Sequence, residues 1–114
     1  GVIMSIKIRG LEKLQKKLID NADPSKVRQL VKKHGAQMQN KAQRLAPVDS
    51  GTLKRSIELE ISLSGLQATV KPTVHYAPYV EYGTRKMEAH PFLKPAYDMQ
   101  EEAFKRDLAL FLKK

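Results

Sequence analysis

The chain has 114 residues, contains no cysteine and carries a formal net charge of +9. This length supports one domain with a single hydrophobic core, and the lack of cysteine excludes disulfides, thiolate metal sites and a cysteine nucleophile. No apolar run reaches the roughly 18 residues that span a bilayer, so we expect no membrane partner. We expect residues 1–114 to form one domain in a reducing cytoplasm, with residues 1–3 as a cloning remnant before a natural start at Met4.

The first predicted elements are a strand and a short helix. Apolar and polar residues alternate over residues 4–9, which is the period of a strand with one buried face. Leucines then recur at helical spacing, so a short helix is expected over residues 11–20. Asp23 and Pro24 predict the start of a further helix, because Asp caps a free N–H and Pro fits the first helical position.

The next predicted helix covers residues 24–45. Its apolar residues form one stripe at steps of three and four, and this stripe includes His34. We interpret His34 as a hydrogen-bonded core residue. Gly35 costs about 1 kcal/mol relative to alanine inside a helix. Either the helix bends there or another element packs closely against it, and close packing against another helix is the preferred expectation. The opposite side of the helix is basic and rich in amides, without any acid.

A β-hairpin is predicted over residues 57–74. Apolar and polar residues alternate strictly before Gly65, and the alternation resumes after it. Pro72 cannot donate a ladder hydrogen bond, so its strand is expected to lie at an edge or to break there. If the N-terminal strand joins this sheet, its basic residues Lys7 and Arg9 are expected across from Glu58 and Glu60.

A last helix is predicted from Pro95 to the C-terminus, with an apolar face that runs from Ala96 to Phe111. Together these elements predict an α+β fold. A small antiparallel sheet, made of the N-terminal strand and the β-hairpin, is expected to pack against the long helix and the C-terminal helix.

Catalytic and metal chemistry find little support in the sequence. The three histidines are far apart and form no His-x-x-x-His pair, so neither a metal site nor a cofactor is expected. A small basic ribonuclease could use His75 or His90 with Glu81 as acid and base. We treat that as the least favoured reading and predict that the chain is not an enzyme.

Two short runs of residues carry the most information about function. In the run Ala46-Pro-Val-Asp-Ser-Gly-Thr-Leu-Lys-Arg-Ser-Ile57, Asp49 and Gly51 suit the start of a short helix that contains residues 53–56. The second run begins at Tyr76 and continues through Gly83-Thr84 to Pro91-Phe-Leu-Lys-Pro-Ala96. Its tyrosines recur at steps of three and would gather on one side of a helical turn, either in a subunit interface or in the core.

These two runs resemble a family of bacteriophage tail components named after gene product ten of a lambdoid phage. The resemblance covers residues 46–97, and it implies a shared structural corner that presents Lys54 and Arg55 to a partner. It implies a structural role as a head-tail joining or tail-completion protein, also described as a minor tail protein, located in the virion at the head-tail junction or in the tail. The implied partners are further copies in a ring around the DNA channel, together with head-tail connector and tail-tube proteins.

The candidate contact residues follow from the two runs, and Glu81 is expected to form an ion pair with Arg85, Arg55 or a neighbouring subunit. The segment from Gly83 to Pro91 is expected to be a loop that is mobile in the monomer and clamps an adjacent copy. The full set is Asp49, Gly51, Leu53, Lys54, Arg55, Tyr76, Tyr79, Glu81, Tyr82, Gly83, Thr84, Arg85, Lys86, Pro91 and Phe92.

The net charge leaves a second reading open. A basic surface attracts polyanions, and Lys32, Lys33, Lys41 and Arg44 are candidates for non-specific contact with DNA in the channel. The alternative function is therefore a small basic nucleic-acid-binding module that uses the basic side of residues 26–44. Against it, no aromatic residue interleaves these basic residues.

Overall fold

The computed structural model describes residues 5–9, 24–47 and 51–112. The predicted helix over residues 11–20, the Asp23 cap and Asp49 lie outside these ranges. Along the chain the elements are β1 (Ile6–Arg9), α2 (Pro24–Leu45), α3 (Thr52–Arg55), β2 (Ile57–Ile61), β3 (Gln67–Pro72), α4 (Ala77–Tyr82) and α5 (Leu93–Leu112). The predicted α+β class is confirmed.

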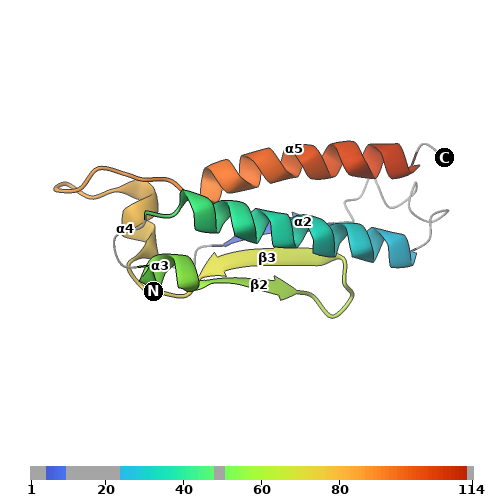
Figure 1. Cartoon of the computed structure of the whole chain (residues 1–114), viewed down its shortest axis with the longest axis horizontal. Helices are drawn as coiled ribbons and strands as arrows, with labels where there is room; N and C mark the ends of the chain where they lie inside the picture. The colour runs from blue at the N-terminus through green and yellow to red at the C-terminus, as the bar shows by residue number, and fades with distance from the viewer. Residues whose placement is uncertain (1–4, 10–23, 48–50, 113–114) are drawn as a thin grey trace.

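The three described strands form one antiparallel sheet in the order β1-β3-β2. Helix α2 packs across all three strands, and α5 lies beside α2 and contacts β1. Figure 1 shows both long helices on the same side of the sheet and parallel to the long axis of the molecule. The molecule is elongated, with principal extents of 52 × 23 × 22 Å.

The strand order corrects the expected pairing of charges on the outer face. Because β3 lies between the other two strands, Lys7 and Arg9 do not face the glutamates of β2. Lys71 on β3 takes that place, and its Nζ lies 2.9 Å from Oε1 of Glu60. Hydrogen bonding and the charge of Glu60 raise the pKa of Lys71 above its usual value. The opposite-charge pairing was predicted correctly in kind, but it was assigned to the wrong strand.

Pro72 ends the central strand. The prediction allowed either an edge strand or a break, and the structure takes the second option, since β3 is central and stops at Pro72. Thr73 continues one step beyond, where its N–H donates to the carbonyl of Ser56. The missing N–H of Pro72 therefore costs no hydrogen bond in the interior of the ladder.

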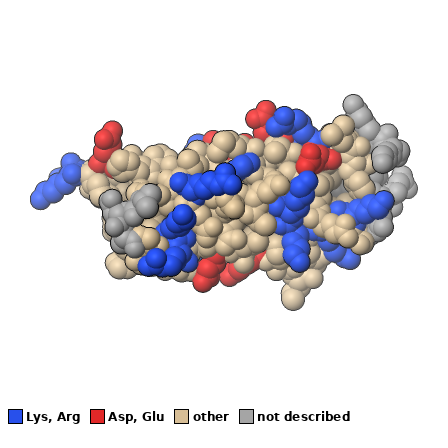
Figure 2. Space-filling view, viewed as in Figure 1, with Lys and Arg blue, Asp and Glu red and all other residues tan. Residues whose placement is uncertain are grey.

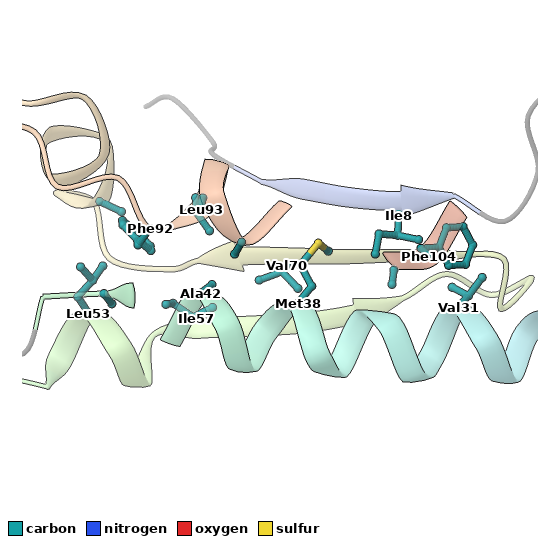
Figure 3. Packing of buried hydrophobic residues seen from close by; sticks show 14 of the residues in the cluster. Ile8, Val31, Met38, Ala42, Leu53, Ile57, Val70, Phe92, Leu93 and Phe104 are labelled. Atoms are coloured by element: carbon teal, nitrogen blue, oxygen red, sulfur yellow. The ribbon is translucent and has the colours of Figure 1, made fainter. Parts of the chain in front are cut away.

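The core fills the space between the helices and the sheet (Figure 3). Its members are apolar side chains from every described element: Ile8, Val27, Val31, Met38, Ala42, Leu53, Ile57, Ala68, Val70, Ala77, Phe92, Leu93, Ala96, Phe104 and Leu108, with Ala46 beyond the end of α2. The predicted stripe of α2 and the predicted apolar face of α5 are thus confirmed as core surfaces.

Gly35 lets α2 approach the sheet. A Cβ at this position would lie 2.6 Å from Cβ of Ala68 and 3.1 Å from Cδ1 of Leu59. A separation under 3.0 Å is one that real Cβ atoms essentially never show. The expectation of close packing was right, but the neighbour is the sheet and not another helix. The absence of a side chain at Gly35 therefore allows the backbone of α2 to pack closely against β3.

Candidate assembly surface

Helix α4 and the start of α5 are joined by a buried carboxylate. The side chain of Glu81 is 4% exposed. Its Oε1 accepts hydrogen bonds from the backbone N–H groups of Phe92 and Leu93 at 2.9 Å each. Its Oε2 accepts from Lys94 N–H at 3.1 Å. The carboxylate thus caps a helix, and the expected ion pair of Glu81 with Arg85 or Arg55 is wrong within the described residues.

This cap satisfies all the free donors at the start of α5. The first turn of a helix leaves N–H groups without intrahelical acceptors. Here three of them bond to Glu81, and the next residue, Pro95, has no N–H to satisfy. The first turn of α5 holds no acid of its own, so Glu81 also supplies the negative charge that favours a helix N-terminus.

The three tyrosines of the second run differ in burial. Tyr76 is half-buried and its ring meets His75 edge-on, with centroids 5.8 Å apart. Tyr79 and Tyr82 are 56% and 73% exposed. The reading in which all three complete the core is wrong for these two residues. Tyr79 and Tyr82 instead stand on a short helix whose position is fixed by the neighbouring cap.

A finger-like loop, residues 83–91, follows α4 and projects from one end of the molecule (Figure 1). Thr84 and Met87 exchange backbone hydrogen bonds, N to O at 2.9 Å and 3.4 Å, so Arg85 and Lys86 form a two-residue tip. The N–H of His90 donates to the carbonyl of Val80 at 2.8 Å, and this bond holds the C-terminal part of the loop against α4. We call residues 83–91 the finger. The prediction of a loop is confirmed, and its mobility stays a prediction.

Gly83 is required where the finger leaves α4. Its φ of 79° and ψ of 176° define a conformation that side-chain-bearing residues rarely adopt. A Cβ there would lie 2.9 Å from two backbone atoms, the nitrogen of Ala89 and the oxygen of Met87. The glycine of the second run is thus a backbone requirement of the finger.

The first run forms a basic corner at the same end of the molecule. Helix α3 begins after Gly51, which has a φ of 71°, and buries Leu53 in the core. Lys54 and Arg55 are exposed, as the prediction of a corner that presents basic residues requires. Figure 1 shows α3 and α4 at this same end. The two runs therefore lie at one end of the molecule.

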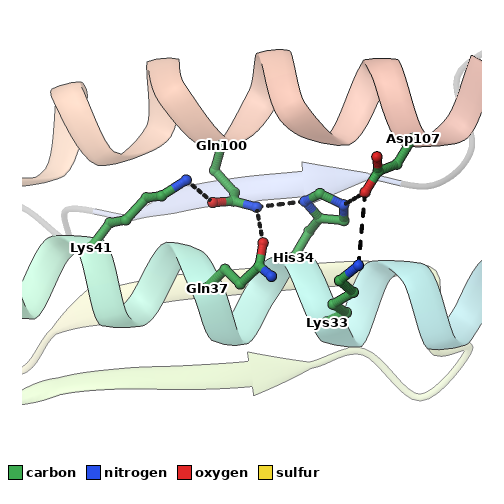
Figure 4. Close-up of polar contacts among 6 residues, drawn as sticks. All are labelled: Lys33, His34, Gln37, Lys41, Gln100 and Asp107. Carbon is green, nitrogen blue, oxygen red and sulfur yellow. Dashed lines mark hydrogen bonds and ion pairs between the residues drawn. The ribbon is translucent and has the colours of Figure 1, made fainter.

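A cluster of polar side chains joins α2 to α5, and Figure 4 shows its members between the two helices. His34 is 1% exposed, and its Nε2 lies 2.7 Å from Oδ2 of Asp107. The amide nitrogen of Gln100 donates to Nδ1 of His34 and to Oε1 of Gln37, while its oxygen accepts from Nζ of Lys41. The interpretation of His34 as a hydrogen-bonded core residue is confirmed.

Sequence reasoning missed the role of Gln100. Gln100 lies within the apolar face that the sequence predicted from Ala96 to Phe111. A glutamine among apolar residues was a signal that its side chain is buried and hydrogen-bonded. The side chain is 0% exposed, and a buried amide is stable only when its donors and acceptor are satisfied. Since the partners all lie on α2, the cluster specifies how the two long helices align.

The candidate DNA contacts on α2 differ in availability. Lys32 and Arg44 are exposed. Lys33 Nζ lies 4.0 Å from Asp107, and Lys41 is held by Gln100. Figure 2 shows Lys and Arg spread over the face on which α2 lies, with acidic atoms mostly towards its upper and lower margins. Two of the four candidates are thus exposed at the surface, and the other two contact members of the polar cluster.

The described residues offer little for acid–base or metal chemistry. His75 and His90 are exposed, and Glu81, their predicted partner, is committed to the start of α5. No group of three His, Asp or Glu side chains within the described ranges could hold a metal ion. None of the described helices is both long enough and apolar enough to cross a membrane.

These features define a small α+β protein that presents aromatic and basic side chains at one end of the molecule. Residues 8–83, about two thirds of the chain, match a family model described as "Bacteriophage HK97-gp10, putative tail-component". The chain belongs to this family of phage tail components. No curated protein and no solved structure matches it.

The match confirms the resemblance and shifts its limits. It begins in β1 and ends at Gly83, so it adds α2 and the second half of β1 to the part of the chain that the resemblance over residues 46–97 covered. Residues 84–91 of the finger and the start of α5 lie outside the matched range, whereas the capping residue Glu81 lies within it. A phage tail component acts within a virion by contact with other virion proteins.

Proposed function

We propose that this protein completes the tail or joins it to the head, and that several copies form a ring at that position. The observation that carries the proposal is the exposure of Tyr79 and Tyr82 on a short helix that Glu81 holds against α5. Aromatic side chains on a pre-ordered surface suit protein contacts, because they bury a large apolar area at low entropic cost. The proposed action involves no catalysis.

A ring requires that one surface of a copy meets a different surface of the next copy. The basic corner of α3, the exposed tyrosines and the finger all lie at one end of an elongated molecule, which gives such a contact a direction (Figure 1). Head-tail connector and tail-tube proteins are the proposed further partners. Lys32 and Arg44 are the most available residues for non-specific contact with DNA in the channel.

The proposal is tested with purified protein and the tail-tube and connector proteins of the same phage. Self-association is measured by sedimentation, and binding to each partner by titration. Replacement of Tyr79 and Tyr82 by alanine is expected to weaken at least one of these contacts by about tenfold or more, the effect of losing an aromatic anchor of about 1.4 kcal/mol or more. Replacement of the exposed Met99 on α5 by alanine is the control. Equal behaviour of both variants and the wild type would contradict the proposal.

A second candidate function is a nucleic-acid-binding module, favoured by the acid-free basic side of α2. It predicts that a monomer binds short duplexes with an affinity that falls steeply with salt. Replacement of Lys32 and Arg44 by glutamine would then reduce the slope of affinity against salt by about two. Assembly as the main function predicts weak duplex binding by the monomer and little change in partner binding for this variant.

A further inference from the structure

The β2 edge of the sheet is open within the described part of the chain. Bonds from Thr73 N to Ser56 O and from Ser62 N to Gln67 O fix which residues of β2 hydrogen-bond to β3. In an antiparallel pair these residues alternate, so the backbone groups of Leu59 and Ile61 point away from β3. The carbonyl of Ile57 points the same way and accepts from the amide of Gln39 at 3.0 Å.

Apolar side chains accompany this open edge. Ile61 is 38% exposed at the end of β2, and Leu63 in the following turn is 111% exposed. An edge strand with unpaired backbone groups and exposed apolar residues is a site for association, and proteins usually cover such an edge. We define the β2 edge as Glu58 to Leu63, and it is therefore a candidate surface for binding another segment.

Charge decides which occupant fits. Glu58 and Glu60 are exposed on the same side of β2, and Figure 2 shows acidic atoms at the lower margin, where Figure 1 places β2. Two β2 edges in antiparallel pairing would bring these glutamates against each other, which is unfavourable. A symmetric β2–β2 dimer is therefore disfavoured, and a basic occupant is favoured, which would share Glu60 with Lys71 of the same copy.

The finger has the matching properties. Arg85 and Lys86 occupy its tip, Met87 beside them is 42% exposed, and all three belong to a segment held in shape by its own backbone hydrogen bonds. The basic pair matches the glutamates of β2. Met87 is an adaptable apolar side chain that can pack on Ile61 and Leu63.

We propose that the finger of one copy docks on the β2 edge of the next copy. In this contact Arg85 and Lys86 face Glu58 and Glu60, and Met87 covers the apolar end of the edge. The finger projects from the end of the molecule and the β2 edge lies along its side (Figure 1). The contact is therefore heterologous and repeats from copy to copy, and it closes into a ring if the rotation allows. This inference rests on the proposed self-assembly and names the surfaces that carry it.

A charge exchange between two variants tests the proposal. One variant carries Arg85→Glu with Lys86→Glu, and the other carries Glu58→Lys with Glu60→Lys. Each places like charges at every contact when it is alone, and its self-association is expected to weaken by about tenfold or more relative to wild type. An equimolar mixture restores opposite charges at every contact, so it is expected to associate within about threefold of wild type in alternating order.

Two controls keep the outcomes distinct. Glu102→Lys on the exposed side of α5 changes the charge away from the β2 edge, and this control is expected to self-associate as wild type does. Circular dichroism checks that each variant folds, and Ile61→Ser with Leu63→Ser tests the apolar part of the edge without a change in charge.

Three results would overturn the inference. Charge variants that associate as wild type does would leave ring assembly standing but remove this contact. A mixture that fails to recover would do the same. A wild-type chain that stays monomeric at every concentration would remove both the contact and the self-assembled ring, while tail-tube binding would still test the role in the tail.

Discussion

Glu81 Oε1 lies 2.9 Å from the backbone nitrogen of Leu93, and this contact holds the start of α5 against α4, the helix that carries the exposed tyrosines. The two residues are far apart in sequence compared with an ordinary helix cap, which comes from the residue just before the helix. The cap therefore couples the position of α4, with its exposed tyrosines, to the body of the fold.

Glu81→Ala is predicted to lower the free energy of unfolding by roughly 3 kcal/mol, because it leaves three buried or half-buried N–H groups without an acceptor. Glu81→Gln keeps one acceptor oxygen and should cost less than the alanine variant. Urea unfolding measures both. Glu88→Ala, at an exposed position on the finger, is the control, and an equal effect of Glu81→Ala and Glu88→Ala would refute the role of the cap.

Gly35→Ala is predicted to destabilise the protein despite the higher helix propensity of alanine. The gain of about 1 kcal/mol in propensity is opposed by overpacking of about 1–3 kcal/mol against Ala68. Ala68→Gly removes the Cβ that lies 2.6 Å away, so the double variant should recover part of the loss. A thermal double-mutant cycle with no coupling between the two positions would show that the close approach is unimportant.

Gln100→Leu is predicted to lower stability by about 2 kcal/mol, because Nδ1 of His34, Gln37 and Lys41 all lose their partner at once. The same change at Gln29, which is exposed on α2, should have an effect within about 0.5 kcal/mol. Denaturant unfolding compares the two variants. Similar values would mean that the polar cluster does not hold α5 against α2.

The same cluster predicts the tautomer of His34. Because the amide of Gln100 donates to Nδ1, the proton of the neutral ring should lie on Nε2 and point to Asp107. Nitrogen chemical shifts from NMR distinguish the two tautomers. A proton on Nδ1 would require the amide of Gln100 to be turned around and would contradict the described arrangement.

The sequence was sufficient for features that depend on local pattern. Alternation around Ile57 predicted β2, and the helical stripe through His34 predicted α2 and its buried face. The position of β3 between the other strands was not predicted, because alternation defines the faces of a strand but not its neighbours. For this reason the charges of Lys7 and Arg9 were assigned to the wrong partners.

The site was predicted less completely than the fold. The two runs named segments that lie at the same end of the molecule, and the exposed Tyr79 and Tyr82 lie among them. The role of Glu81 was missed, because an acid in a basic chain suggests an ion pair and its actual partners are backbone N–H groups that only tertiary structure brings near. Gly35 showed the same limit, since its neighbour is a strand more than twenty residues away along the chain.

Electron microscopy of particles made without this protein tests the central claim most directly. The gene is deleted in the producing phage and supplied in trans, either as wild type or with Tyr79→Ala and Tyr82→Ala. We predict that the deletion yields unjoined heads and tails or incomplete tails, that wild type restores infectious particles, and that the tyrosine variant restores few. Complete, infectious particles in the absence of the protein would contradict its proposed role in virion assembly.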